Sequence, residues 1–253
     1  MLASNNLKQF GLIGYPLGHS FSADFFTRLF EREHISAHYT PYELSSIDQL
    51  EVLLKTQRNL YGLNVTSPYK AAVLEYATDL SLEVVAIGAA NVLHIRRDVQ
   101  GRIKGITAHN TDIIGFRDSL LPHLAHLTDS RALILGTGGA ARSVSYVLEH
   151  LGLGCTLVSR SSQVGAIGYG DIAAHLSESR LIVQATPVGL RQGQVVQFPY
   201  DMLTADHLCY DLIYNPSETG FLLEAKRFGA QTKNGLEMLH GQALAAWKIW
   251  ETP

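Results

Sequence analysis

An apolar run that leads directly into a glycine-rich turn constrains the fold of this chain more than any other feature. Ala132 to Leu135 has the character of a buried strand, and Gly136-Thr137-Gly138-Gly139-Ala140-Ala141 follows it at once. A helix is expected next, with an apolar face made of Ala140, Val144, Val147, Leu148 and Leu151. A strand, a tight glycine turn and a helix in this order predict a unit that binds a dinucleotide.

The residues of the turn suit a pyrophosphate group. Gly136 permits the tight turn, Gly138 lets the backbone approach the phosphates, and the small Ala141 lets helix and strand pack closely. Unpaired N–H groups at the start of the helix, where Gly139 and Ala140 lie, add a partial positive charge. The alternative is a tight turn without a ligand, and the strand–turn–helix setting favours nucleotide binding over it.

The end of the second strand indicates which dinucleotide is bound. Sites for NAD usually place Asp or Glu there to bind the ribose 2′-hydroxyl, whereas Ser159, Arg160 and Ser161 follow the expected strand Cys155–Val158. A guanidinium can pair with a 2′-phosphate in a bidentate fork, and both hydroxyls can donate to the same phosphate. Arg142, in the first turn of the helix, adds a second positive charge. We therefore predict NADP, against the alternative that Arg160 is simply solvated.

Apolar runs that alternate with helical segments predict the rest of the fold. In the second half, Leu181–Ala185 and Leu208–Leu212 have the character of buried strands, so an α/β unit with a parallel sheet covered on both faces is expected. In the first half we expect strands at Gln9–Tyr15 and Leu60–Val65, a helix with Phe21, Phe25, Phe26, Leu29 and Phe30 on its apolar face, and a hairpin of Asn91–Ile95 with Arg102–Ile106.

Two more helices complete this prediction. Ser67 is a favourable N-cap and Pro68 suits a first helical position, so Lys70 is expected in the first turn of a helix that turns Ala71, Ala72 and Leu74 inward. A last helix, Leu236–Trp250, has an apolar face that includes Trp247 and Trp250. We place the boundaries so that residues 1–108 with 233–253 form a discontinuous substrate-binding domain. Residues 109–232 then form a doubly wound, Rossmann-type nucleotide-binding domain.

Charge and cysteine content exclude several classes of protein. The formal net charge is -3 and no dense basic run occurs, which argues against a nucleic-acid partner. No apolar stretch approaches the roughly 20 residues that cross a bilayer. Cys155 and Cys209 match no metal-ligand spacing, so we expect no metal, two free thiols and a cytoplasmic protein. We further expect a monomer or homodimer.

Polar clusters at the expected strand ends carry a resemblance to a known family. They are Gly18-His19-Ser20-Phe21-Ser22, Asn64-Val65-Thr66-Ser67-Pro68-Tyr69-Lys70, Asn91 and Asn110-Thr111-Asp112, followed by the turn at Gly136–Arg142, Ser159-Arg160-Ser161, Ala185-Thr186-Pro187, Asp211 to Pro216, and Asn234 to Leu239 with Gln242. In order and spacing they resemble the shikimate dehydrogenase family over nearly the whole chain.

The resemblance implies two α/β domains with an active site in the cleft between them, where 3-dehydroshikimate is reduced to shikimate with NADPH. It implies that Ser20 and Ser22 bind the substrate carboxylate and that Thr66, Lys70, Asn91, Asp112 and Gln242 surround the ring hydroxyls. Tyr214 would approach the substrate, and Thr186 would border the cofactor. Tyr39 and Tyr69 are assigned to packing and local hydrogen bonds.

The chemistry of ketone reduction explains why Lys70 and Asp112 are the predicted catalytic pair. Hydride reduction of a ketone builds negative charge on its oxygen, so a proton donor must lie within hydrogen-bond reach. At a helix N-terminus the dipole favours the neutral amine of Lys70, and Asp112 favours the ammonium and fixes its direction. Each residue also has a plain alternative, because Lys70 could be solvated and Asp112 could cap the helical run Ile113–Leu121.

Other functions are also compatible with these residues. Ser67 and Val92 depart from the usual family residues beside the pocket, so a quinate/shikimate dehydrogenase of broader specificity is the nearest alternative. A non-catalytic relative that binds shikimate-like ligands is a second alternative, disfavoured because Lys70 and Asp112 are both present. An unrelated reductase that shares only the nucleotide-binding unit is disfavoured by the motifs of the first half.

Overall fold

The computed structural model describes residues 7–18, 21–161 and 164–252, and the chain divides into two compact units. The first unit runs to Thr111 and includes the segment from Ala243 onward, and the second spans Asp112–Gln242. The divisions therefore lie after Thr111 and after Gln242, later in the chain than the expected 108/109 and 232/233. The last helix, α8 (Leu236–Glu251), contains the second of them.

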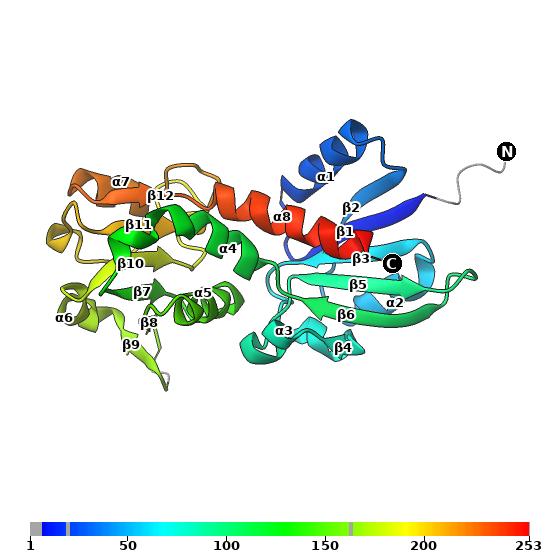
Figure 1. The fold of residues 1–253 in the computed structure, drawn as a ribbon, viewed down its shortest axis with the longest axis horizontal. Helices are drawn as coiled ribbons and strands as arrows, with labels where there is room; N and C mark the ends of the chain where they lie inside the picture. The colour runs from blue at the N-terminus through cyan, green and yellow to red at the C-terminus, as the bar shows by residue number, and fades with distance from the viewer. Residues whose placement is uncertain (1–6, 19–20, 162–163, 253) are drawn as a thin grey trace. The chain divides into compact units, whose positions relative to one another are not determined.

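The first unit is built on a six-stranded mixed sheet (Figure 1). Its strand order is β2-β1-β3-β5-β6-β4, in which β1 pairs in parallel with β2 and β3, and β5 pairs antiparallel with β3 and β6. The expected hairpin is confirmed as β5 with β6. The elements of this unit are β1 (Lys8–Gly14), α1 (Phe21–Arg32), β2 (Ala37–Glu43), α2 (Gln49–Thr56), β3 (Leu60–Val65), the 3-10 helix η1 (Ala72–Tyr76), β4 (Asp79–Leu80), α3 (Leu82–Ile87), β5 (Val92–Arg97) and β6 (Ile103–His109).

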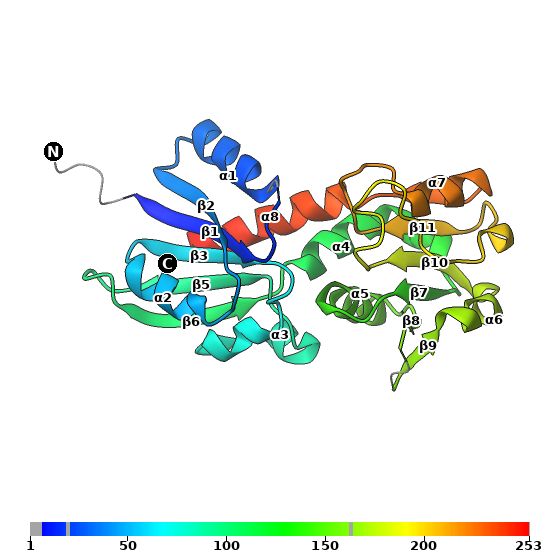
Figure 2. The same ribbon diagram turned by 180° about the vertical axis from the view of Figure 1, so that it is seen from behind.

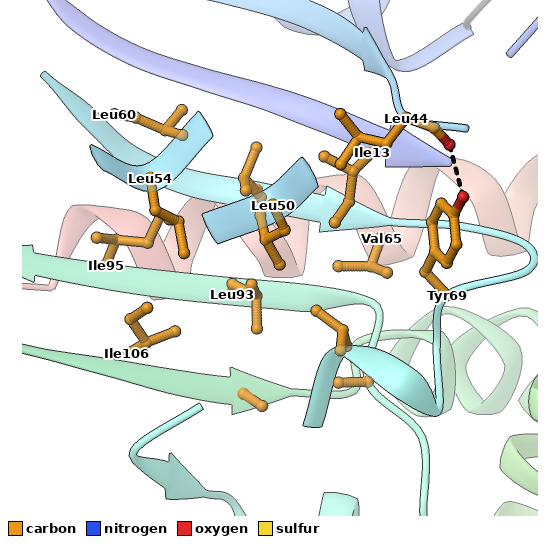
Figure 3. Close-up of a cluster of buried hydrophobic side chains, with 14 of the residues drawn as sticks. Ile13, Leu44, Leu50, Leu54, Leu60, Val65, Tyr69, Leu93, Ile95 and Ile106 are labelled. Carbon is orange, nitrogen blue, oxygen red and sulfur yellow. Dashed lines mark hydrogen bonds between the residues drawn. The ribbon is translucent and has the colours of Figure 1, made fainter. Parts of the chain in front are cut away.

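Alternation along the strands divides the core of this unit between the two faces of the sheet. Phe10 and Leu12 of β1 pack with α1 and the end of α8, whereas Ile13 packs on the opposite face. That opposite face is covered by α2, whose Leu50 and Leu54 lie over the strands (Figure 3). The expected Phe-rich helix is confirmed, because Phe26, Leu29 and Phe30 are the buried residues of α1.

Trp250 ties the end of α8 to the first sheet. Its indole is 3% exposed, stacks on Phe10 with ring centroids 5.0 Å apart, and donates its N–H to the Leu93 carbonyl at 3.0 Å. Gly62 leaves the space that the indole fills, because a Cβ at Gly62 would overlap the indole. The apolar face expected for the last helix is therefore confirmed at Trp250.

The second unit is a doubly wound parallel sheet (Figure 2). Its strand order is β12-β11-β10-β7-β8-β9, and every pair in it is parallel. The chain builds outward from β7 in both directions, which is the topology of dinucleotide-binding domains. Its elements are α4 (Asp112–Leu120), η2 (Leu121–Leu127), β7 (Arg131–Leu135), α5 (Gly139–His150), β8 (Cys155–Ser159), β9 (Ala166–Gly168), η3 (Tyr169–Asp171), α6 (Ile172–Leu176), β10 (Ser179–Gln184), η4 (Tyr200–Met202), β11 (Leu208–Asp211), α7 (Gly220–Arg227) and β12 (Gln231–Lys233).

Helices cover both faces of the parallel sheet, as expected from its apolar strands. Helices α4 and α5 pack on the face that presents Ala132 and Ile134. Helices α6 and α7 pack on the face that presents Leu133 and Leu135. The α/β fold class predicted from the sequence is confirmed. In the part of the chain that the structure describes, no helix is long and apolar enough to span a membrane.

Candidate functional site

The glycine-rich turn lies where the strand order of the second sheet reverses. It follows β7, between the strands β8 and β10 that continue the sheet on either side, and ligands of such sheets bind beyond the carboxyl ends of the strands at this point. Gly136 has φ +118°, and a Cβ there would meet the Ala185 carbonyl and Thr186 Cγ2 at 3.1 Å. The turn after β7 is therefore packed against the segment that follows β10, and Gly136 suits it because it lacks a side chain.

The start of α5 fits the phosphates of a dinucleotide. A Cβ at Gly138 would meet no protein atom within 4 Å, and Gly138 is the N-cap without a side-chain hydrogen bond to the helix. Backbone N–H groups of Gly139 and Ala140 in the first turn are thus left to a ligand. Ala141 is fully buried against the strands, as expected for the small third position. Among the described residues, Arg142 Nε is a buried nitrogen without a hydrogen-bond partner.

The segment after β8 presents the side chains predicted to contact a 2′-phosphate. Ser159 ends β8 and is buried, and its hydroxyl accepts the Ser161 N–H at 3.3 Å. Arg160 and Ser161 are exposed. Burial raises the pKa of Tyr169, and the positive charge of Arg160 partly offsets that rise. The structure therefore places a cation and two hydroxyls at the carboxyl end of β8.

Lys70 lies in a turn, and the expectation of a helix capped by Ser67 is wrong. Residues 67–71 form turns that include a cis Ser67–Pro68 peptide bond, and the helix that follows is η1, which begins at Ala72. Val73 is the buried residue of η1, and Leu74 packs, partly buried, against the same core as predicted, whereas Ala71 is exposed. Lys70 therefore lies outside the first turn of a helix, and the predicted effect of a helix dipole on its amine does not apply.

Neighbouring core contacts hold this turn in place. Tyr69 is buried among Ile13, Leu44 and Val65, and its hydroxyl donates to the Leu44 carbonyl at 2.6 Å (Figure 3). The Lys70 carbonyl accepts the Ala90 N–H at 2.7 Å. The packing role predicted for Tyr69 is thus confirmed, and it fixes the backbone next to Lys70.

Thr66 and Asn91 lie at strand ends that are joined by hydrogen bonds. Thr66 donates its N–H to the Ile13 carbonyl at 2.9 Å. The Asn91 amide oxygen accepts the Thr111 N–H at 2.7 Å, and its amide nitrogen donates to the Thr111 hydroxyl at 3.0 Å. Asn91 is 3% exposed. It therefore fixes the backbone immediately before Asp112, which is itself buried and is the first residue of α4.

The first unit contains a series of buried, hydrogen-bonded polar side chains that was not predicted as part of the site. The Tyr39 hydroxyl donates to the Asn64 amide oxygen at 2.7 Å, and the Asn64 amide nitrogen faces the Asn91 carbonyl at 3.5 Å. Burial raises the pKa of Tyr39 well above its usual value, and a hydrogen bond with Ser22 of α1 opposes that rise. Tyr39 thus joins Ser22 to the strand that leads to Thr66. Ser20, predicted together with Ser22, lies outside the described residues.

The remaining predicted residues are positioned by the second unit. Tyr214 follows β11 in the segment that leads to α7, and partial burial raises the pKa of its hydroxyl. Gln242 of α8 is 9% exposed and donates its amide N–H to the Leu239 carbonyl at 3.0 Å. The lack of a side chain at Gly115 lets α4 and α8 pack closely, because a Cβ at Gly115 would overlap the Met238 carbonyl of α8.

Asp211 is a buried carboxylate that braces the segment carrying Tyr214. It ends β11, is fully buried, accepts the Thr219 hydroxyl at 2.6 Å and accepts the Ile213 N–H at 2.9 Å. Burial raises its pKa to about 6, although both hydrogen bonds oppose the rise. The sequence motif includes Asp211, but its bracing role becomes visible only in the structure.

We expect the free energy of unfolding of Asp211→Asn, relative to the wild type, to be higher at pH 8 than at pH 5 by about 1–2 kcal/mol. Because the folded-state pKa is raised to about 6, the stability contributed by Asp211 is fully present below its unfolded value near 4. It is lost as the pH rises through about 6. The neutral amide avoids this loss, so the Tm of the variant minus that of the wild type should be larger at pH 8 than at pH 5. A Tm difference that is the same at both pH values would contradict the expectation.

The described residues give no sign of a metal centre. No group of three or more His, Cys, Asp or Glu side chains is positioned among them to hold an ion. Both cysteines are free thiols, and burial raises the pKa of Cys209 to about 12.

The fold and the site define the class of the protein. A doubly wound sheet with an open glycine turn at its switch point, joined in sequence to a second α/β unit, defines a two-unit dinucleotide-binding protein.

Comparisons with known proteins narrow this class. The family profile for the shikimate dehydrogenase substrate binding domain matches residues 12–93. A protein of Carboxydothermus hydrogenoformans named shikimate dehydrogenase (NADP(+)) is 34% identical, covering 99% of this chain and 94% of the relative. The chain therefore belongs to the shikimate dehydrogenase family.

Solved structures share the whole fold. The shikimate 5-dehydrogenase of Thermus thermophilus, in complex with NADP(H) and shikimate, aligns with TM-score 0.80 and 29% identity over 98% of this chain and 94% of that one. A quinate dehydrogenase of Corynebacterium glutamicum, in complex with NAD, aligns with TM-score 0.84 and 26% identity over 98% and 95%.

Proposed function

We propose that the protein catalyses the reversible, NADP(H)-dependent reduction of 3-dehydroshikimate to shikimate, a step in the formation of chorismate and the aromatic amino acids. One observation carries the proposal: the chain matches a relative named shikimate dehydrogenase (NADP(+)) over 99% of its length at 34% identity. The glycine turn and the basic segment after β8 support the cofactor independently of that match.

Lys70 and Asp112 are the proposed catalytic pair. When bound, NADPH supplies a hydride to the ketone carbon of the substrate. Lys70 donates a proton to the ketone oxygen as negative charge develops there, so that an alcohol forms, and Asp112 orients the amine. In the reverse direction Lys70 accepts the hydroxyl proton. Asp112 suits its role because Asn91 fixes the backbone before it through Thr111.

The substrate is a small acid with several hydroxyls, so polar side chains should hold it. We propose that Ser20 and Ser22 bind its carboxylate and that amide and hydroxyl groups bind its ring hydroxyls. A site of this kind discriminates strongly, because a missing partner leaves buried polar groups unpaired. The proposed substrate-binding residues are Ser20, Ser22, Thr66, Asn91, Tyr214 and Gln242.

The second unit is proposed to hold NADP. The open side of Gly138 and the unpaired Arg142 Nε fit an anionic ligand. The proposed cofactor-binding residues are Gly136, Gly138, Gly139, Ala140, Ala141, Arg142, Ser159, Arg160, Ser161 and Thr186.

Replacing Arg160 tests the choice of NADP. We expect Arg160→Ala to lower the ratio of kcat/KM for NADP to kcat/KM for NAD about 10- to 100-fold, because a hydrogen-bonded charge pair with the 2′-phosphate is lost. Arg180→Ala, at another exposed arginine of the same unit, is the matched control and should leave the ratio unchanged. An unchanged ratio in the Arg160 variant would remove Arg160 from the cofactor site.

The experiment that tests the proposed reaction compares shikimate and quinate, each with NADP and with NAD, in steady-state kinetics. We expect the highest kcat/KM for shikimate with NADP. The similarity to a quinate dehydrogenase bound to NAD makes quinate a competing substrate. A higher kcat/KM for quinate with NAD would replace the proposed function with that alternative.

We further propose that the enzyme acts in the cytoplasm, on small molecules alone, as a monomer or homodimer. The two free thiols agree with a reducing compartment. Size-exclusion chromatography with light scattering measures the oligomeric state, and an assembly larger than a dimer would contradict this part of the proposal.

A further inference from the structure

A single glutamine side chain shapes the segment that faces the glycine turn. Gln184 is the last residue of β10 and is fully buried. Its amide oxygen accepts the Thr186 N–H at 2.8 Å, and its amide nitrogen donates to the carbonyls of Val188 at 2.7 Å and Thr186 at 3.2 Å. One side chain thus satisfies three backbone groups of residues 186–188, the turn that follows β10.

The turn braced by Gln184 lies directly against the dinucleotide turn. A Cβ at Gly136 would meet both the Ala185 carbonyl and Thr186 Cγ2 at 3.1 Å, so little space separates the two segments. The main chain of Gln184 is fixed as well, because β10 pairs with β7 on one side and with β11 on the other. The Ala185 N–H also donates to the Leu135 carbonyl at 2.9 Å, and the Thr186 hydroxyl accepts the Val188 N–H at 3.2 Å. The side chain of Gln184 adds three hydrogen bonds to these two contacts.

No other residue type would make all three hydrogen bonds. The contacts require one acceptor and two donated N–H groups at the end of a chain long enough to reach past Ala185. Glutamate has the length but, when ionised, cannot donate to the two carbonyls, and leucine has the volume without either group. A buried polar group that loses its partners is costly, so the surrounding turn would rearrange in either variant.

We propose that Gln184 is a positioning residue of the cofactor site. It holds the Thr186 segment against the glycine turn, so that this side of the NADP(H) site is already formed before the cofactor binds. The proposal rests on the proposed function, because Thr186 is taken to border the cofactor. Gln184 acts through Thr186 and does not itself need to touch the ligand. Its contribution should therefore appear in cofactor affinity, and turnover at saturating NADP should change little.

The test measures NADPH binding by fluorescence titration, which requires no turnover. For Gln184→Leu and Gln184→Glu we expect the dissociation constant of NADPH to rise about tenfold. A rise of this size equals the free energy that roughly one hydrogen bond contributes to binding. The KM for NADP should rise by a similar factor, with the KM for shikimate unchanged and kcat within about threefold of the wild type.

Gln194→Leu is the matched control, because Gln194 also braces this loop through its side chain. Its amide oxygen accepts the N–H groups of Gly189 and Arg191 at 3.2 Å, but it is exposed and lies farther along the chain from the glycine turn. The dissociation constant of NADPH for Gln194→Leu should match that for the wild type.

Three results would overturn the proposal. They are an unchanged NADPH dissociation constant in folded Gln184 variants, an equal weakening in Gln194→Leu, and failure of both Gln184 variants to fold, which would make Gln184 a residue of stability alone. Failure of the proposed function looks different, because a wild-type protein that binds NADPH but does not oxidise shikimate leaves the binding test of Gln184 intact.

Discussion

Replacing Lys70 by alanine is expected to lower kcat about 10²- to 10⁴-fold, the range that a positioned general acid contributes. The side chain is only partly buried and lies in a turn that Tyr69 and Ala90 hold in place. The fold should therefore survive its removal. Initial rates of NADP reduction at saturating shikimate measure the effect, and circular dichroism with a melting curve checks the fold.

Lys104→Ala provides the control for this loss. Lys104 is an exposed lysine of β6 in the same unit, so its removal changes the net charge equally and should leave kcat within about twofold of the wild type. Near-normal turnover in Lys70→Ala would exclude Lys70 as the proton donor, and an equal loss in both variants would point to a general charge effect.

The second large effect is expected on stability. Trp250→Ala should cost about 3–5 kcal/mol of the free energy of unfolding, the range for removing a large aromatic side chain from a core. The indole stacks on Phe10, fills the space above Gly62 and satisfies the Leu93 carbonyl. Urea denaturation followed by tryptophan fluorescence and far-ultraviolet circular dichroism measures the loss.

Two variants separate packing from hydrogen bonding at this position. Trp250→Phe keeps much of the ring contact but loses the N–H donor, so it should cost less than the alanine variant. Leu244→Ala, at a half-exposed position of α8, should cost less than about 1 kcal/mol. A loss below about 1 kcal/mol for Trp250→Ala would show that the end of α8 contributes little to the first unit.

The sequence predicts the dinucleotide-binding part of the second unit because its signals are local, whereas β9, α6, α7 and β12 were not predicted. The apolar strand β7, the glycine turn and the amphipathic helix α5 lie next to one another in the chain, and the structure confirms all three. In the first unit β2 was not predicted, and Pro41 explains why. Proline removes a ladder donor and disfavours a strand, yet β2 is at the sheet edge, where proline is tolerated.

The errors at the candidate site have a different cause. Ser67 and Pro68 satisfy the rules for a helix start, but the chain first forms a turn that buries Tyr69, and tertiary packing of that kind has no local signature. The same holds for Gln184, whose only signal was a polar residue at the end of an apolar strand. The hydrogen-bond partners of Tyr39, Asn64 and Asp211 also depend on contacts between residues that are not neighbours in the sequence, so a local pattern does not predict them.

Absorbance at the NADPH band, recorded after the purified protein is mixed with shikimate and NADP, tests the proposed reaction directly. We expect a rise that depends on both compounds and that reverses when 3-dehydroshikimate is added with NADPH. A folded protein that binds NADPH, yet leaves the absorbance unchanged in both directions, would contradict the proposed reaction.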